Sequence, residues 1–334
     1  MQIPYQKYTF TIEAVEELHL PYYKGSTFRG GFGNMFKKVA CALRRQDCTD
    51  CMLRSRCIYA YVFETPSFEG AEIMNMHKYE KVPHPFVIEP PLIGSDFNPE
   101  SRGILNKSWS VSPGEKIEFN LILIGRATEY LPYFIFTFDE LGKIGIGKGR
   151  GKYRLIEVSI ANDSPSKRIC VYNESERTVG NIHTDEIYIP DDFRTSDKVS
   201  ELTLHLITPL RIKYNRDLVV KLGFHILIRN LLRRLGLLYY FHCGQKKPIW
   251  DHREIIDHAE SIKILDSRLK WYDWERYSFR QNTRMRLGGL LGEIAYSGEI
   301  EPFMPLLRAG EILHAGKGTS FGLGKYRIAQ KKDF

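Results

Sequence analysis

A short basic glycine loop occurs twice in this sequence. Residues 149–155 read GRGKYRL, and residues 322–328 read GLGKYRI. The register extends backwards, because Gly145 falls opposite Gly318 when the two loops are aligned. Self-similarity at a fixed spacing is the signature of a duplicated unit. The sequence therefore predicts a chain of two related halves, each of which closes with the same loop.

The elements predicted in the second half have a definite order. An alternating strand at 201–208 is followed by a helix at 217–241, in which apolar residues recur at helical spacing. The segments KWYDWERYSF and LGGLLGEIAYSG then predict two strands of a hairpin, Pro302 opens a short helix, and KYRIA forms the last strand. The resulting order is β-α-β-β-α-β.

The first half repeats this order more loosely, from the strand YTFTIEA to the closing strand GKYRLIEVSI. A unit of this order forms a four-stranded antiparallel sheet with two helices on one face. We therefore expect an α+β fold of tandem ferredoxin-like, RRM-like domains at 1–160 and 201–334. The polar residues 161–200 are expected to form a linker with a peripheral hairpin.

The charge of the chain indicates a polyanionic partner. The formal net charge is +8, and the cations are clustered: residues 142–154 carry five cations and no acid, while residues 276–286 carry four arginines, two aromatic residues and no acid. Cations beside aromatic rings suit a nucleic acid whose bases can stack, and a solvated charged face is the alternative. The start MQIPYQKYTF lacks the order of a signal peptide, and no apolar stretch has the length of a membrane span. A cytoplasmic protein with no membrane partner is therefore expected.

The second glycine loop, HAGKGTSFGLGKYR at 314–327, differs from the common phosphate-binding loops. Tyr326 follows Gly324 and Lys325 where a Walker loop has serine or threonine, and the loop precedes a strand instead of following one. Its glycines still allow backbone amides to approach a phosphate, while Lys317 and Lys325 add positive charge. The alternative is a tight helix-to-strand turn that needs positive φ angles.

The segment from DWERYSFRQ to MRLGGLLGEIAYSGEIEPFMPLLRAGEILHAGKGTSFGLGKYRI resembles the carboxyl-terminal half of the CRISPR-associated repeat-cleaving endoribonucleases, which belong to the repeat-associated mysterious protein (RAMP) superfamily. STFRGGFG, CIYAYVFETP and VPHPFVIEPP extend the resemblance through the first half, and it is weakest at 161–200. The resemblance implies tandem ferredoxin-like domains that bind the CRISPR precursor transcript (precursor crRNA), with a CRISPR effector complex as a further partner. From the cation clusters, the glycine loop and this resemblance together, the expected RNA-binding residues are Arg29, Arg280, Arg284, Lys317, Gly318, Gly322, Gly324 and Lys325.

The resemblance also implies a single metal-independent cut within each repeat. The 2′-hydroxyl beside the scissile phosphate attacks it and leaves a 2′,3′-cyclic phosphate and a 5′-hydroxyl. Such an attack needs a base, an acid and cations near the phosphate. Relatives usually place a histidine on or beside the first helix, but this chain has no histidine between Leu20 and Met76.

Four side chains are candidates for this chemistry. His19, Tyr22 and Lys24 lie just before the first predicted helix, and His314 is the first residue of the second glycine loop, which we expect to bind the phosphate near the cut. Histidine suits proton transfer near neutral pH, and a tyrosine–lysine pair can support slower cleavage. The alternatives are an ordinary loop position for His19 and a helix C-cap donor for His314.

Cysteines are concentrated near the end of the first predicted helix. Four of the six lie within residues 41–57, and they are Cys41, Cys48, Cys51 and Cys57. In a cytoplasmic chain this density predicts a metal-binding, cysteine-rich insertion in the first domain, not disulfides. A structural zinc ion is favoured, a 4Fe-4S cluster is the alternative, and unligated core cysteines are the third interpretation.

Three functions follow from these observations. The first is an endoribonuclease that processes CRISPR precursor RNA. The second is a non-catalytic RNA-binding protein of the same superfamily that retains or presents guide RNA, which the absence of a histidine in the first helix keeps open. The third is an unrelated metal-dependent module whose cysteine site is redox-active or binds DNA.

Overall fold

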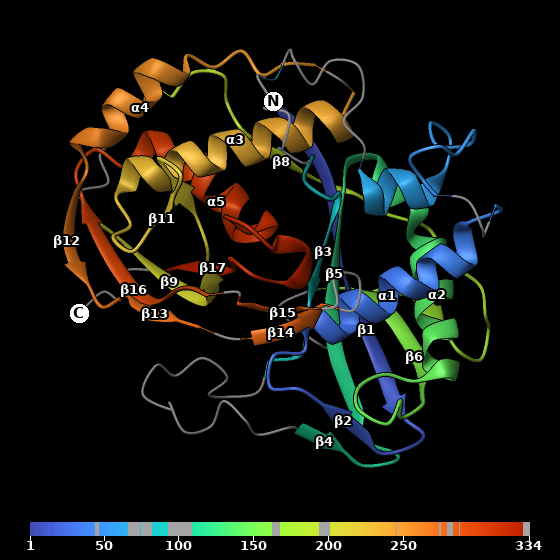
Figure 1. The fold of residues 1–334 in the computed structure, drawn as a ribbon. Helices are drawn as coiled ribbons and strands as arrows, with labels where there is room; N and C mark the ends of the chain where they lie inside the picture. Colours follow the sequence, from blue (N-terminus) through green and yellow to red (C-terminus); the bar gives the residue numbers. More distant parts are fainter. Residues whose placement is uncertain are drawn as a thin grey trace.

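The computed structural model describes residues 1–43, 47–65, 74, 82–92, 109–161, 168–193, 201–244, 246–273, 275–278, 283–286 and 288–329, and it describes 275–278 and 283–286 by their backbone alone. The chain forms two domains with the same β-α-β-β-α-β order (Figure 1). Within the described parts, no helix combines the length and the hydropathy needed to cross a bilayer.

The two domains have the same sheet topology. The first contains β1 (Gln2–Ala14), α1 (Gly25–Ala40), β3 (Phe86–Glu89), β5 (Lys116–Ile124), α2 (Leu131–Ile144) and β6 (Tyr153–Ile160). The second contains β9 (Glu201–Leu210), α3 (Phe224–His242), β12 (Lys263–Ser267), β16 (Gly289–Ser297), α5 (Met304–Leu313) and β17 (Tyr326–Ala329). The strand orders are β3-β5-β1-β6 and β12-β16-β9-β17, so each sheet reads second, third, first, fourth. The predicted tandem ferredoxin-like fold is therefore confirmed.

Further strands and helices are added to the two β-α-β-β-α-β units. The strands are β2 (Leu18–Leu20), β4 (Trp109–Val111), β7 (Cys170–Asn173), β8 (Asp185–Tyr188), β10 (Lys213–Tyr214), β11 (Asp217–Leu218), β13 (Lys270–Tyr272), β14 (Glu275–Ser278) and β15 (Thr283–Arg286). The helices are α4 (His252–Ser261), a π-helix at Ala60–Glu64 and short 3-10 helices at Gly125–Tyr130, Glu301–Phe303 and Thr319–Phe321. β13 pairs with β16 as predicted, while β14 and β15 pair with each other.

The structure corrects one predicted boundary and adds detail to the segment between the domains. The helix predicted at 217–241 begins only at Phe224, because the hairpin of β10 and β11 occupies the preceding residues and Gly223 is the N-cap. In the described part of 161–200, an isolated antiparallel bridge pairs Tyr172 with Val179, and the amide of Gly180 donates to the carbonyl oxygen of Val171 at 2.8 Å, so a short local hairpin is present. The segment is more than a linker, because β7 pairs with β6 and β8 pairs with the start of β1, so both strands extend the first sheet.

The first sheet is covered by hydrophobic packing on both faces. On one face, Phe32 of α1 stacks on Phe134 of α2 with ring centroids 4.9 Å apart, above a layer of sheet aromatics. On the other face, Val87, Ile122 and Ile124 belong to the core of the second domain, together with the leucines of α3. Two-sided burial explains why β5 ends in the continuous apolar run LILI, and it fixes the two domains against each other.

Both glycine loops are attached to the preceding helix in the same way. The hydroxyl of Tyr153 donates to the carbonyl oxygen of Phe138 at 2.8 Å, and the hydroxyl of Tyr326 donates to that of Leu307 at 2.6 Å. The repeated Gly-Lys-Tyr-Arg motif thus supplies a buried tyrosine that fastens each loop beneath its helix.

The structure corrects the register that the sequence predicted for the loops. α2 is followed by Gly145 at φ +86° and ψ +162°, and α5 is followed by His314 at φ +64° and ψ +162°. Gly145 therefore corresponds to His314 and not to Gly318. The second loop is longer because it contains the additional 3-10 helix Thr319–Phe321.

Candidate functional site

The second glycine loop (residues 314–325) is wedged between the two domains. Gly322 has a φ of +83°, and a Cβ atom there would lie 2.7 Å from the carbonyl oxygen of Ile88 and 2.6 Å from Cδ of Pro90. The carbonyl oxygen of Gly322 accepts a hydrogen bond from Oγ1 of Thr208 at 2.8 Å. Glycine is needed here because the first domain approaches the loop closely. The buried Gly322 and Gly324 therefore contact protein, where the sequence predicted contact with a phosphate.

A buried carboxylate, Glu89 of β3, joins this loop to the first domain. Its oxygens lie 2.9 Å from Nε2 of His314, 2.9 Å from Nζ of Lys325 and 2.8 Å from Nζ of Lys7. Nδ2 of Asn120 donates to the same carboxylate at 3.1 Å. Burial alone would raise the pKa of Glu89, but the hydrogen bond from His314 and the charges of Lys325 and Lys7 hold it well below 4.5. Glu89 is therefore an ionised link between the domains.

His314 is fully buried and is engaged at both ring nitrogens. Nδ1 lies 3.0 Å from the carbonyl oxygen of Leu323, and Nε2 contacts Glu89. Burial lowers the pKa of His314, while the hydrogen bond to Glu89 opposes that shift. Both partners can only accept, so both contacts are hydrogen bonds only when both nitrogens carry protons. The role of a general base that contacts RNA, predicted for His314, does not fit this geometry, and neither does RNA binding by the mostly buried Lys325.

Lys24 also lies at the junction of the domains instead of facing solvent. Its side chain is 1% exposed, and Nζ donates to the carbonyl oxygen of Tyr22 at 2.9 Å. The ammonium group lies 5.0 Å from the centre of the Trp109 ring. The hydroxyl of the neighbouring Tyr23 donates to the carbonyl oxygen of Phe321 in the second loop. Lys24 therefore orders the segment that leads into α1, and its predicted catalytic role does not fit its burial.

Arg29 of α1 makes a similar bridge between the domains. Its guanidinium carbon lies 4.1 Å from the ring centre of Phe63 and 4.7 Å from that of Phe321 in the second loop. Nη2 lies 3.2 Å from Nε2 of His84, whose ring stacks on Phe63. Arg29, predicted to bind RNA, is thus held between two rings at the junction of the domains.

The first glycine loop (residues 145–152) is open to solvent. The side chains of Lys148, Arg150 and Lys152 are exposed, and Lys152 pairs with Glu16 at 3.1 Å. Arg150 has a φ of +55° between two glycines at the tip of the loop. A non-glycine residue in this conformation carries a conformational cost, so the tip displays a cation at a position that favours glycine.

His19 lies in a short row of side chains beside this first loop. On β2 it is paired with Ser110 of β4, and an isolated antiparallel bridge pairs it with Lys148 on the other side. Residues directly opposite each other in antiparallel pairs project from the same face, with Cβ atoms about 4.5–5.5 Å apart. Ser110, His19 and Lys148 therefore form a row on one face, which we call the His19 row.

The His19 row has the geometry of an oriented acid–base group. Oγ of Ser110 lies 3.0 Å from Nδ1 of His19, and the side chain of His19 is 43% exposed. The amide of Lys148 donates to the carbonyl oxygen of His19 at 2.9 Å. A Cβ atom on Gly147, which has a φ of +76°, would lie 2.3 Å from the same oxygen. The loop is thereby fastened to β2, and an exposed imidazole lies beside the exposed chain of Lys148.

The remaining predicted RNA-binding and catalytic residues are dispersed. Lys317 is exposed, its amide donates to the carbonyl oxygen of Arg211 at 2.8 Å, and Gly318 follows it with a φ of +78°. Tyr22 is half-buried between β2 and α1. Arg284 lies in β15, of which the backbone is described, and Arg280 lies outside the described residues.

The predicted cysteine site is not assembled in the described residues. All four cysteines are free and half-buried. Burial raises the pKa of the Cys48 thiol, and Cys41 and Cys57 are near enough to raise it further. The described part of the chain nevertheless holds no group of three or more histidine, cysteine or acidic side chains placed to bind a metal ion. Zinc or iron–sulfur ligation therefore stays a prediction.

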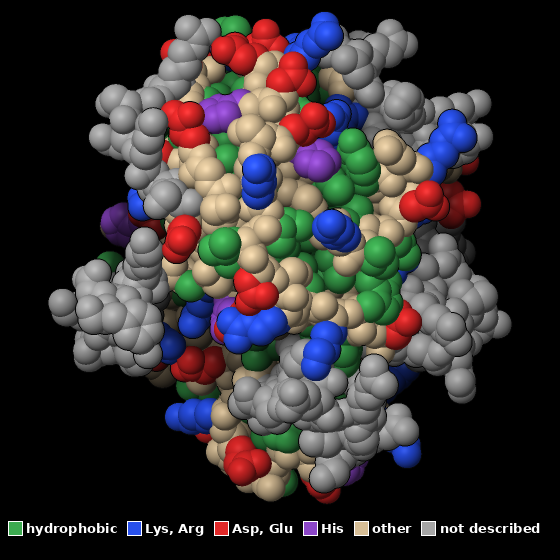
Figure 2. Space-filling view, turned by 90° about the vertical axis from the view of Figure 1, so that its left-hand side faces the viewer, with side chains coloured by type: hydrophobic (Ala, Val, Ile, Leu, Met, Phe, Trp, Pro, Cys, Tyr) green, Lys and Arg blue, Asp and Glu red, His purple; other side chains and the backbone are tan. Residues whose placement is uncertain are grey.

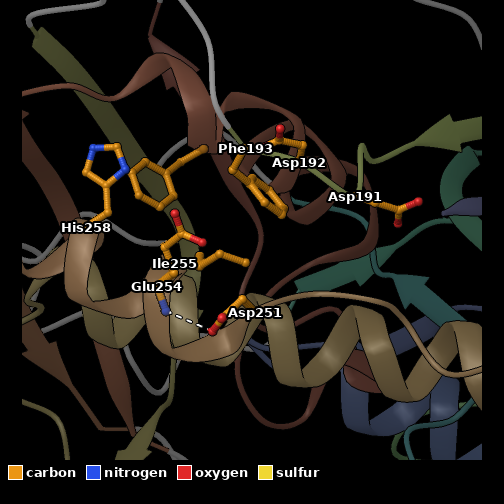
Figure 3. Close-up of a pocket in the computed structure, with 8 residues that line it drawn as sticks. Asp191, Asp192, Phe193, Asp251, Glu254, Ile255 and His258 are labelled. Atoms are coloured by element: carbon orange, nitrogen blue, oxygen red, sulfur yellow. Dashed lines mark hydrogen bonds between the residues drawn. The ribbon is translucent and has the colours of Figure 1, made fainter.

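A small pocket beside the start of α4 has the wrong charge for RNA (Figure 3). Its volume is about 80 Å³, and its carboxylates are Asp191, Asp192, Asp251 and Glu254. Oδ1 of Asp251 accepts hydrogen bonds from the first amides of α4, which makes it an N-cap. Acidic, basic and hydrophobic side chains are interspersed on the adjoining face of the molecule (Figure 2). Carboxylates repel phosphate, so this pocket is not a candidate RNA site.

Sequence reasoning missed three residues, one in the group of contacts around Glu89 and two in the His19 row. Glu89 ends the apolar run FVIE, where a single acid next to buried residues was a usable signal. Lys148 belongs to a basic cluster that was recognised, but its pairing with His19 was not. No sequence pattern connected Ser110 with His19, because their strands are three residues long.

Comparison with known proteins identifies both halves of the chain. Residues 3–184 match the family model of the AF_1859 N-terminal domain, and residues 204–326 match that of the CRISPR-associated endoribonuclease Cas6. An uncharacterised protein of Archaeoglobus fulgidus is 25% identical over 314 residues, which are 93% of each chain.

Two solved structures share the fold. A Thermus thermophilus Cas6 in a product complex superposes with a TM-score of 0.53 at 14% identity, covering 97% of this chain and 100% of its own. A chain of a partial Cas6-RT-Cas1–Cas2 complex superposes with a TM-score of 0.55 at 12% identity, covering 99% of this chain and 47% of its own.

Proposed function

Because the chain belongs to the family defined by the AF_1859 N-terminal domain and carries a Cas6 domain in its second half, we propose that it is an endoribonuclease that cleaves CRISPR precursor RNA once within each repeat. The proposed reaction is a metal-independent attack of a 2′-hydroxyl on the adjacent phosphate. The bond from phosphorus to the 5′ oxygen breaks, and the products end in a 2′,3′-cyclic phosphate and a 5′-hydroxyl.

The observation that carries this proposal is the His19 row. The proton of the attacking 2′-hydroxyl passes to the imidazole of His19, whose Nε2 is the suitable acceptor because Ser110 contacts Nδ1. Ser110 supports this role because its contact with Nδ1 orients the ring. An oriented general base contributes about 10²- to 10⁴-fold to a reaction rate.

Lys148 and Arg150 supply the positive charge that the reaction needs. The negative charge on the phosphate oxygens increases as the fifth bond to phosphorus forms, and cations placed beforehand stabilise it. Lys148 follows His19 in the same row, and its ammonium also offers a proton for the departing 5′ oxygen. Both cations are exposed on a loop that the buried hydroxyl of Tyr153 fastens to α2.

The second candidate function is RNA binding without cleavage. It is favoured by the burial of Lys24 and His314, two of the four side chains that the sequence nominated for catalysis. In this case the chain retains or presents guide RNA, and a CRISPR effector complex is its expected partner. The exposed cations of the first loop fit both functions, so binding alone does not distinguish them.

Cleavage of a labelled cognate repeat RNA in excess EDTA distinguishes the two functions. We expect one cut with a cyclic-phosphate end, and we expect His19→Ala to slow it at least about 100-fold. Lys148→Met should slow cleavage, while Lys152→Met is its matched control in the same loop, because Lys152 already pairs with Glu16. Binding without cleavage by the wild-type chain would leave only the non-catalytic function.

His314→Ala needs separate treatment, because its loss of activity could come from instability. We expect His314→Ala to lower the melting temperature, whereas His19→Ala should leave it within a few degrees of wild type. Cleavage that survives His19→Ala, but is lost in His314→Ala at a temperature where that variant remains folded, would refute the assignment of the base.

A further inference from the structure

We infer that the hairpin of β10 and β11, together with the adjoining face of α3, forms a second contact for RNA, on which an unpaired base stacks against Tyr214. The hairpin lies beside the first turns of α3 (Figure 1). It belongs to the second domain, whereas the His19 row belongs to the first. The inference rests on the proposed function only in that the ligand is the same RNA.

Tyr214 is flanked by two side chains of one helical face. Its ring lies 5.9 Å from that of His225, at an angle of 73°, and 5.8 Å from the guanidinium carbon of Arg229. His225 and Arg229 are four residues apart on α3 and therefore project from the same face. Tyr214 is half-buried and Arg229 is exposed, so the ring is held in place while part of it stays accessible. A fixed aromatic ring beside a cation suits a base and its phosphate.

The hairpin turn places another cation beside this ring. Asn215 and Arg216 both have positive φ angles, +50° and +72°, as a two-residue hairpin turn requires. Glycine is favoured at the second position, yet Arg216 occupies it with an exposed side chain. Such a backbone conformation in an arginine carries a cost that points to a function for the side chain. Lys213 is also exposed, and Asp217 is the acid of the same hairpin.

Arg229, whose guanidinium carbon lies over the Tyr214 ring, is one of three cations that act on His252 at the start of α4. Burial lowers the pKa of His252, and the charges of Lys247, Arg233 and Arg229 lower it further, against the opposing effect of Asp251. Within the part of the chain that the structure describes, no carboxylate pairs with Arg229. Next to Arg229, Oδ1 of Asn230 accepts a hydrogen bond from the amide of Gly316 at 2.8 Å. The hairpin of β10 and β11 and the adjoining face of α3, which we call the Tyr214 platform, therefore lie near the second glycine loop.

The chemistry of this platform favours single-stranded RNA. A stacking ring needs an unpaired base, because the faces of bases inside a duplex are already covered. Cations on a hairpin tip and a helix face suit the phosphates on either side of that base. The expected ligand is therefore an unpaired segment that flanks the cleaved part of the repeat.

Fluorescence anisotropy with a labelled repeat RNA that carries unpaired flanks tests the platform. Measurement in the His19→Ala background keeps cleavage from interfering. We expect Tyr214→Ala to weaken binding about 5- to 150-fold, the range for loss of one stacked base, and Tyr214→Phe to retain most of the affinity. Arg229→Gln should reduce the slope of log affinity against log salt by about 0.7, the value for one phosphate on a single strand.

Tyr188→Ala is the matched control, because Tyr188 is a 66% exposed tyrosine on β8 of the first domain. Equal affinities for Tyr214→Ala and Tyr188→Ala would overturn the inference. A fully paired RNA whose binding depends equally on Tyr214 would overturn it too. Cleavage by the chain with native His19 is measured separately, so that Tyr214-dependent binding without cleavage would count against the proposed function alone.

Discussion

Replacing Glu89 with alanine removes a carboxylate that contacts three basic side chains and one amide at the junction of the domains. The contacts are 2.8 Å to Lys7, 2.9 Å to Lys325, 2.9 Å to His314 and 3.1 Å to Asn120. The side chain of Glu89 is 5% exposed and that of Lys325 is 17% exposed. The substitution therefore leaves a mostly buried ammonium group without its counter-charge.

The expected cost follows from that burial. Removing one partner of a buried ion pair destabilises a protein by about 3–5 kcal/mol, because the other charge stays buried and unpaired. That is a large part of a total stability of about 5–15 kcal/mol. At about 2.1 cal/mol/K of unfolding entropy per residue, a chain of 334 residues should show a fall in melting temperature of about 4–7 °C. Urea denaturation, followed by tryptophan fluorescence and circular dichroism, measures the change in free energy of unfolding.

Glu118→Ala is a suitable control because Glu118 lies on the same sheet, in β5, and makes an exposed ion pair with Arg168 at 2.7 Å. Pairs of that kind contribute about 0–1 kcal/mol. Glu89→Gln, Lys325→Met and the double variant complete a double-mutant cycle. The double variant should lose less free energy of unfolding than the sum of the losses in the two single variants. Equal stabilities for Glu89→Ala and Glu118→Ala would show that Glu89 does not join the domains.

Three other outcomes are expected. Burial lowers the pKa of His242 to about 4, so between pH 6.5 and 4 the unfolded chain binds a proton that the folded chain does not. The free energy of unfolding should therefore fall by about 3 kcal/mol as the pH drops from above 6.5 to 4. Denaturation curves at several pH values measure this dependence, and His242→Gln should reduce it. Gly147→Ala should lower the cleavage rate at least about tenfold, because its Cβ atom would clash with the carbonyl oxygen of His19. Gly149 also has a positive φ, but a Cβ atom there would meet no atom within 4 Å, so Gly149→Ala should retain more activity in the same assay. Metal analysis of the purified chain should find about one zinc per molecule that is lost in Cys48→Ser, while absorbance near 400 nm would indicate an iron–sulfur cluster instead.

The fold was predictable because its strongest signals are local. Alternation in β9, helical spacing in α3 and α5, and the repeated loop each lie within a short window of sequence. The parts that were missed are short elements whose strands pair with distant segments. Three-residue strands such as β2 and β4 have too few residues to show alternation, and their pairing joins His19 to a serine 91 residues away.

The site was less predictable, because its geometry depends on which surfaces the domains cover. Proximity to a basic glycine loop favoured His314 over His19 as the catalytic base. In the fold, Glu89 lies 225 residues away from His314 in sequence but 2.9 Å away in space. His314 is buried because one domain packs on the other, and no sequence pattern within the second half could predict that packing.

The different fates of the two loops can be traced to equivalent positions after α2 and α5. Gly145 adopts its positive φ without steric cost, and its short loop stays in solvent beside His19. His314 adopts nearly the same backbone angles with a side chain, at a conformational cost of about 1–3 kcal/mol. The contact of Nε2 with Glu89 offsets part of that cost, and it forms only when the loop packs against β3. A histidine at this position therefore couples the conformation of the loop to the docking of the domains, so that the second loop joins the domains, whereas the first stays exposed to solvent, as the proposed function requires.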